Sequence, residues 1–207
     1  MSRKRGGSAE SFKVKLTKID VAAESLKAAV RLFFEDTYPS AVYLLAASAR
    51  ELATTLADKI GADSLLTDVA EGLGMSRVAL INVVHRFASF MKHANRDPQG
   101  TIELPDKDVE AVLFIACNDF FRTTGGMPPE AHIFQVWCGL TNFQRITDAP
   151  LRMQAELRRL IPKFPGIRRA SPKARKQIGL KVLNEAAGNG LWGSEYKRIV
   201  ELPGKTS

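Results

Sequence analysis

The stretch PSAVYLLAASARELATTLADKI, residues 39–60, decides the fold class of this chain. Its apolar residues recur every three or four positions and form one wide stripe: Val42, Leu45, Ala46, Ala49, Leu52, Ala53 and Leu56. This period is typical of an amphipathic α-helix, and the small alanines permit another helix to approach closely. Gly61 is a natural C-terminal cap. The stretch therefore predicts a long helix that packs against other helices.

Similar patterns occur on both sides of this stretch. Thr17 is a plausible N-cap with Asp20 three residues later, and Tyr38-Pro39 ends the first helix because the residue before proline avoids helical angles. Further helices are predicted over residues 64–72, 77–95, 106–122, 130–146, 151–161 and 173–187. No alternating segment typical of a strand appears. The expected fold is an all-α, up-and-down helical bundle over 12–148, with a basic lead (1–11) and a basic helical C-terminal extension (149–207).

Composition places the chain among globular proteins with one core, since 45% of its 207 residues are hydrophobic and 25% are charged. The net charge of +8 is unevenly distributed. Residues 152–181 contain ten basic residues and one acidic residue, and residues 1–18 contain six and one, whereas 19–151 carry a net −6. Two basic ends on an acidic body indicate an anionic partner; the alternative is that the ends only improve solubility.

Several classes of protein are not indicated by any motif. The first residues are charged but lack the apolar segment of a signal peptide, and no apolar run is long enough to span a bilayer. We therefore expect a cytoplasmic protein without a membrane partner. Cys117 and Cys138 are predicted to be buried free thiols. No metal-ligand spacing, phosphate-binding glycine loop or serine-nucleophile motif occurs, so neither a metal nor a cofactor is expected.

One polar stripe in the predicted helix 77–95 could carry chemistry. Asn82, Arg86, His93 and Arg96 follow at helical spacings, so they share one face. An imidazole moves protons near neutral pH, and a guanidinium binds phosphate through two hydrogen bonds. Together they could cleave RNA without a metal, with the 2′-hydroxyl as nucleophile. The alternative is a histidine stabilised by the helix dipole beside solvated arginines.

The segment Ala88-Ser-Phe-Met-Lys-His-Ala-Asn-Arg-Asp-Pro98 resembles bacterial HEPN-like helical proteins, as do Ala28-Ala-Val-Arg-Leu-Phe-Phe-Glu35 and residues 40–52. The resemblance covers about 15–145. It implies a helical bundle, frequent dimerisation and an association with RNA or nucleotides. Catalytic members carry an arginine and a histidine separated by four to six residues, usually with a polar residue after the arginine. Here six residues separate Arg86 from His93, and Phe87 follows the arginine.

By this resemblance the chain is a metal-independent endoribonuclease or a non-catalytic relative. In the first case His93 transfers the proton and Arg86 holds the phosphate, in a composite site across a homodimer. A different function is a helix-turn-helix DNA-binding regulator, formed by residues 64–74 and 76–95 with Arg77 and Asn82 near a groove. The acidic residues before Arg77 oppose DNA phosphate.

The third possibility is a non-enzymatic interaction module that uses its basic residues. RNA or another polyanion would bind through 152–181. The residues expected to bind nucleic acid are Arg96, Arg158, Arg159, Lys163, Arg168, Arg169, Lys173, Arg175 and Lys176.

Overall fold

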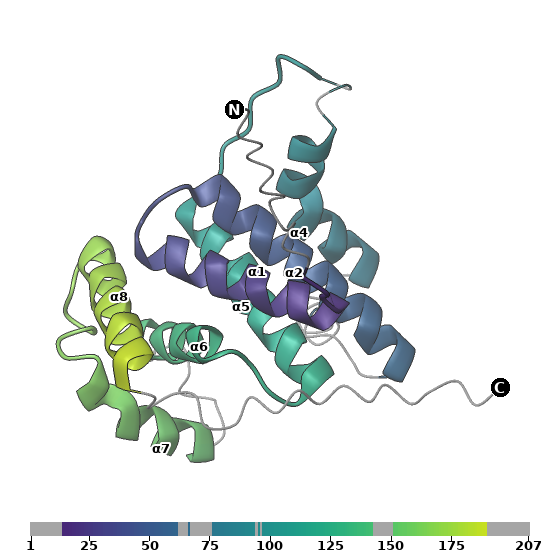
Figure 1. Cartoon of the computed structure of the whole chain (residues 1–207). Coiled ribbons are helices and arrows are strands. Elements are labelled where there is room, and N and C mark those ends of the chain that lie inside the picture. Colours follow the sequence, from purple (N-terminus) through teal and green to yellow (C-terminus); the bar gives the residue numbers. More distant parts are fainter. Residues whose placement is uncertain are drawn as a thin grey trace, which may run out of the picture.

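A computed structural model describes residues 14–61, 66, 76–93, 95, 97–142 and 151–189. These residues form helices and connecting turns without a strand, so the predicted all-α helical bundle is confirmed (Figure 1). The helices are α1 (Lys18–Phe34), α2 (Pro39–Ile60), α4 (Arg77–Lys92), α5 (Asp106–Thr124), α6 (Pro129–Thr141), α7 (Leu151–Leu160) and α8 (Pro172–Asn189), with a 3-10 turn at Ile161–Lys163.

The ends of the first helices follow their sequence signals. The Thr17 hydroxyl accepts a hydrogen bond from the Asp20 N–H at 3.1 Å, and the Asp20 carboxylate accepts one from the Thr17 N–H at 3.0 Å. This reciprocal capping box satisfies donors that a helix N-terminus otherwise leaves free. Gly61 ends α2 with a φ of 68°, a left-handed conformation that costs glycine little. The predicted N-cap of α1 and the predicted C-cap of α2 are therefore confirmed, whereas α1 ends at Phe34, before the predicted stop at Tyr38-Pro39.

Other boundaries differ from the predicted ones. The helix expected over 77–95 ends at Lys92, and the one expected over 130–146 ends at Thr141. Conversely, α5 continues to Thr124, whose hydroxyl donates to the Phe120 carbonyl and stays within the helix. Most of the helix expected over 64–72 lies outside the described residues. The early end of α4 matters most, because His93 then follows the helix rather than lying on it.

The centre of the bundle is formed by α1, α2 and α5, with α6 packed beside them. Phe33 and Phe34 of α1 meet Phe134 and Trp137 of α6, with ring centroids 5.1 to 6.1 Å apart. Most of these pairs are edge-on, an arrangement favoured between aromatic rings. Because α8 contacts both α1 and α6, this region connects an early helix of the chain with a late one.

The basic C-terminal segment contributes to the same core. Buried side chains from it join the hydrophobic cluster of the bundle: Leu157, Phe164, Ile167, Val182 and Leu183. The indole N–H of Trp137 also donates to the Arg175 carbonyl at 2.8 Å. The segment predicted as an extension is therefore packed on α1 and α6 over its described part.

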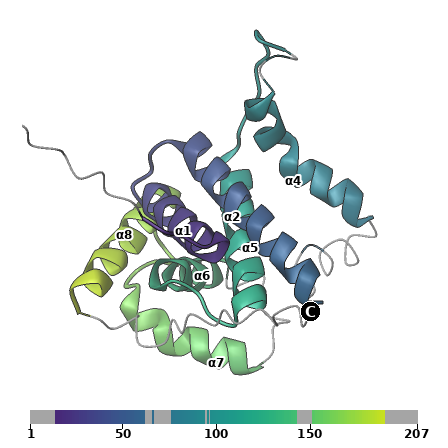
Figure 2. The same ribbon diagram turned by 45° about the vertical axis from the view of Figure 1, so that its right-hand side comes forward.

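In contrast, α4 packs against α2 at the edge of the bundle (Figure 2). The Tyr43 hydroxyl of α2 donates to the Val84 carbonyl of α4, and the rings of Tyr43 and Phe87 lie 5.0 Å apart. Phe87 and Ala88 are buried in this contact. These contacts fix the rotation of α4, so its apolar residues face α2 and its polar residues flank that contact.

Cys117 and Cys138 are buried and free, as predicted. None of the helices in the described part of the chain combines the length and the apolar character needed to cross a membrane.

Candidate functional site

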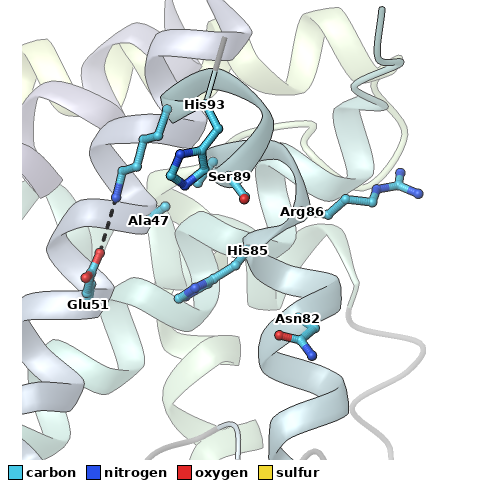
Figure 3. A pocket seen from close by; sticks show the side chains of 9 residues that line it. Ala47, Glu51, Asn82, His85, Arg86, Ser89 and His93 are labelled. Carbon is cyan, nitrogen blue, oxygen red and sulfur yellow. Dashed lines mark hydrogen bonds and ion pairs between the residues drawn. The ribbon is translucent and has the colours of Figure 1, made fainter. Parts of the chain in front are cut away.

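A cavity of about 430 Å³ lies between α2 and α4 (Figure 3). Ala47 and Glu51 line it from α2, one turn apart. All other lining residues come from α4 or directly follow it: Asn82, His85, Arg86, Ala88, Ser89, Lys92 and His93. Three of the four residues predicted to form a polar stripe, Asn82, Arg86 and His93, are thus brought to one site. Arg96 lies outside the described residues.

The spacing along α4 explains this gathering. Asn82, His85, Ser89 and Lys92 follow one another at intervals of three or four residues, which keeps them on one face of a helix. Opposite them α2 presents Ala47, whose methyl group leaves open volume between the two helices. A polar helix face against a small residue therefore gives a cavity rather than a packed contact.

The side chains differ in direction within the site. In Figure 3, His85 and His93 lie on the side of α4 that faces Glu51, whereas Arg86 extends away from them. The predicted pairing of Arg86 with His93 assumed that both are helical, seven residues apart. Since α4 ends at Lys92, the direction of His93 follows the turn after the helix instead. The two residues line one cavity, but their side chains do not converge.

Two positive side chains, Arg86 and Lys92, and one negative side chain, Glu51, line the cavity, and one ion pair crosses it. The Lys92 ammonium lies 3.4 Å from the Glu51 carboxylate, and both side chains are more than half exposed. Such an exposed pair adds little stability but holds Lys92 beside the two histidines. Burial lowers the pKa of His85 from its ordinary value of 6.5; nearby Arg50 and Lys92 lower it further, while Glu51 opposes this effect. His85 is therefore neutral at physiological pH.

Arg86 lies between this cavity and a smaller one of about 160 Å³, which Tyr43, Phe87, Glu103, Leu104 and Asp108 also line. Burial raises the pKa of Tyr43 above 10.0, and Asp108 raises it as well, while the charges of Arg50 and Arg86 lower it. The phenol therefore stays protonated and keeps donating to α4.

The basic residues of the C-terminal segment divide into two groups. The side chains of one group are exposed on α7, on the turn after it and at the start of α8: Arg158, Arg159, Lys163, Arg168, Arg169 and Lys173. We call these six residues the basic surface. Phe164 and Ile167 are both fully buried, and they anchor in the core the turn that carries several residues of the basic surface. The basic surface is thus presented by a well-anchored segment.

The other two predicted residues, Arg175 and Lys176, make internal contacts. Arg175 donates from Nε to the Ile167 carbonyl at 3.1 Å and from a terminal nitrogen to the Arg168 carbonyl at 3.2 Å. The Lys176 ammonium lies 2.6 Å from Asp36 Oδ1 and 4.8 Å from the centre of the Phe33 ring. These two side chains hold α8 and its preceding turn in place, so they are less available to a ligand.

The cavity and the basic surface lie on different sides of the molecule. In both overall views α4 lies on one side of the α1–α2–α5 centre, and α7 and α8 lie on the other (Figures 1 and 2). The two groups of predicted site residues therefore do not form one continuous site.

The donor groups of the cavity suit an anion better than a metal ion. Among the described residues, no cluster of three or more His, Cys, Asp or Glu side chains could hold a metal. Imidazole, guanidinium, ammonium and amide groups instead offer N–H donors to phosphate oxygens. The lining therefore offers hydrogen-bond donors and positive charge to an anion, together with two imidazoles.

Sequence reasoning missed six of the nine cavity residues, and three of the six carry an ionisable side chain: Glu51, His85 and Lys92. His85 and Lys92 share the face of Asn82 and Ser89, so helical spacing could have found them. Glu51 belongs to another helix, and nothing in the sequence relates α2 to α4 at that position. The packing of Tyr43 on α4 and the ion pair with Lys92 place it beside the cavity.

Comparison of the chain with protein-family models, with curated proteins and with solved structures gave no significant match.

Proposed function

We propose that this chain is an HEPN-like helical protein that binds RNA and cleaves it without a metal in the cavity between α2 and α4. The observation that carries the proposal is the gathering of Arg86, Lys92 and two histidines, His85 and His93, around one cavity. Positive groups bind the phosphodiester, and an imidazole transfers a proton at neutral pH. The resemblance of residues 88–98 to HEPN-like proteins agrees with this assignment.

In this proposal His93 is a proton-transfer residue, and Arg86 holds the phosphate from the rim of the cavity. Arg86 is exposed, and no hydrogen bond or ion pair of its side chain is found within the described residues. Its long side chain can therefore turn toward a bound phosphate without breaking a hydrogen bond or ion pair to a described residue. A homodimer, in which a second copy completes the site, is also part of the proposal; light scattering at several protein concentrations would test it.

The test is incubation of the purified protein with end-labelled RNA of mixed sequence in the presence of a chelator. We expect products that end in a 2′,3′-cyclic phosphate, and we expect the loss of cleavage in His93→Gln and Arg86→Ala. His132→Gln is the matched control, because His132 is exposed on α6 outside this cavity. Cleavage that survives His93→Gln would contradict the assignment.

A second function, non-enzymatic binding of a polyanion, is favoured by the basic surface. Its residues are exposed, and the turn that carries Arg168 and Arg169 is fixed by buried Phe164 and Ile167. Phosphates bound there would release counterions, so the affinity would fall steeply with salt concentration. If the parent protein binds RNA with this salt dependence but never cleaves it, the interaction module is the better description.

A further inference from the structure

We infer that His85 is the second proton-transfer residue of the cavity, the base that complements His93 as the acid. This inference rests on the proposed ribonuclease function and adds to its chemistry. Two imidazoles transfer protons during cleavage of the phosphodiester, and Arg86 only binds the phosphate. His85 lines the cavity together with His93, and both rings lie on the side of α4 toward Glu51 (Figure 3).

The surroundings of His85 suit a base. Its ring is partly buried, and the groups near it are Arg50 and Glu51 of α2 and Lys92 of α4. Burial and two positive charges against one negative charge disfavour the imidazolium, which lowers the pKa of His85. Within the described residues its ring makes no hydrogen bond or ion pair. A nitrogen lone pair is therefore available to a ligand in the cavity.

The reaction balances with these two groups alone. Neutral His85 removes the proton of the 2′-hydroxyl, and the 2′-oxygen forms a bond with phosphorus. The bond between phosphorus and the 5′-oxygen breaks, and protonated His93 gives its proton to that oxygen. The products are a 2′,3′-cyclic phosphate and a free 5′-hydroxyl. Proton exchange with water then restores both imidazoles. The Lys92 ammonium, paired with Glu51, lines the same cavity and can offset charge on a phosphate bound there.

The experiment measures kcat and KM for a short RNA substrate in chelator, from pH 5 to pH 9, for four proteins. These are the parent, His85→Gln, His93→Gln and the control His132→Gln. We expect His85→Gln to lower kcat by about 100-fold or more, in the range of general acid–base catalysis, with little change in KM. The acidic limb of the pH profile, which reports the base, should disappear. In a fifth protein, His85→Ala, added imidazole should restore part of the rate.

The outcomes distinguish the inference from the proposed function. If the parent cleaves and His93→Gln does not, but His85→Gln keeps its rate and its acidic limb, only the role of His85 is overturned. If a changed circular dichroism spectrum shows that His85→Gln is unfolded, the folded His85→Ala variant decides: a rate that imidazole does not restore rejects the role. If the parent does not cleave RNA, the ribonuclease function and the role of His85 are rejected together.

Discussion

The contact between α8 and α1 at Gly179 allows a stability prediction whose size follows from the structure. A Cβ atom placed on Gly179 would lie 2.3 Å from Phe34 Cε1, 2.6 Å from Cδ1 and 2.8 Å from Cζ. Carbon atoms in contact normally lie about 3.5–4.0 Å apart. The substitution Gly179→Ala therefore requires α8 or the ring of Phe34 to move by about an ångström.

The ring of Phe34 has little room to move. Only 1% of Phe34 is exposed, and its ring lies 5.6 Å from that of Phe33 and 5.7 Å from that of Trp137. The helix has little freedom either, because Trp137 also holds the Arg175 carbonyl of α8. The added methyl group therefore strains a packed region rather than filling a void.

Two opposing free energies set the expected effect of Gly179→Ala. Overpacking of a core costs about 1–3 kcal/mol, and alanine in place of glycine within a helix returns about 1 kcal/mol. Since the overlap involves three ring atoms, we expect a net loss of about 1–2 kcal/mol in the free energy of unfolding. For a chain of this size that corresponds to a fall in Tm of roughly 2–8 °C.

The assay is urea and thermal unfolding followed by circular dichroism, with Gly139→Ala as the matched variant. A Cβ at Gly139 would meet only the end of the Leu157 side chain, with Cδ2 at 2.8 Å and Cδ1 at 3.1 Å. A leucine side chain can rotate away, so this second substitution should cost less. If Gly179→Ala is as stable as the parent or more stable, the close packing of α8 on Phe34 is refuted.

Three other predictions concern single side chains. Lys176→Ala should lower Tm and leave RNA affinity nearly unchanged, because the Lys176 ammonium contacts Asp36. Lys173→Ala should instead lower RNA affinity and leave Tm nearly unchanged, because Lys173 is exposed. Equal effects of the two substitutions on RNA affinity would contradict this division. Burial raises the pKa of both thiols, Cys117 and Cys138, so a thiol reagent at pH 7.5 should modify the native protein at least tenfold more slowly than the protein in urea. Because the pKa of His85 is lower in the folded state than its ordinary 6.5, the unfolded state takes up the proton first, and the free energy of unfolding should fall as pH drops below 6.5. This pH-dependent fall in the free energy of unfolding should be smaller in His85→Gln. If the curves of free energy against pH are parallel for the two proteins, the prediction is refuted.

Local signals in the sequence were sufficient to predict most helices. The apolar stripe of residues 39–60 and the cap at Gly61 predict α2 with its observed bounds, because burial of one face and the left-handed turn act on neighbouring residues. The Thr17–Asp20 capping box is equally local. The end of α4 was placed three residues too late, because the signal used was the Asp97-Pro98 turn rather than the residue where the helix stops.

Long-range contacts were not predictable in the same way. Lys176 is one of several lysines and arginines in a basic run, and its partner Asp36 is 140 residues away in the sequence. Composition therefore indicated an extension, whereas Phe164 and Ile167 anchor that segment in the core. The same limit applies to the cavity: spacing placed Asn82 on a polar face but gave no reason for Glu51 to lie opposite.

The separation of the cavity from the basic surface leads to a prediction about substrate length. A dinucleotide in the cavity cannot also reach α7 and α8, which lie on the other side of the bundle, whereas a long RNA can contact both. Replacing Arg168 and Arg169 together by alanine should therefore weaken binding of a long single strand. The logarithmic salt slope should become shallower by about 1.4, since each phosphate contact on a single strand contributes about 0.7. Cleavage of a dinucleotide by the same variant should equal that of the parent, because the residues proposed to transfer protons are untouched. An equal loss with both substrates would show that the two surfaces act as one site, contrary to their positions in the fold.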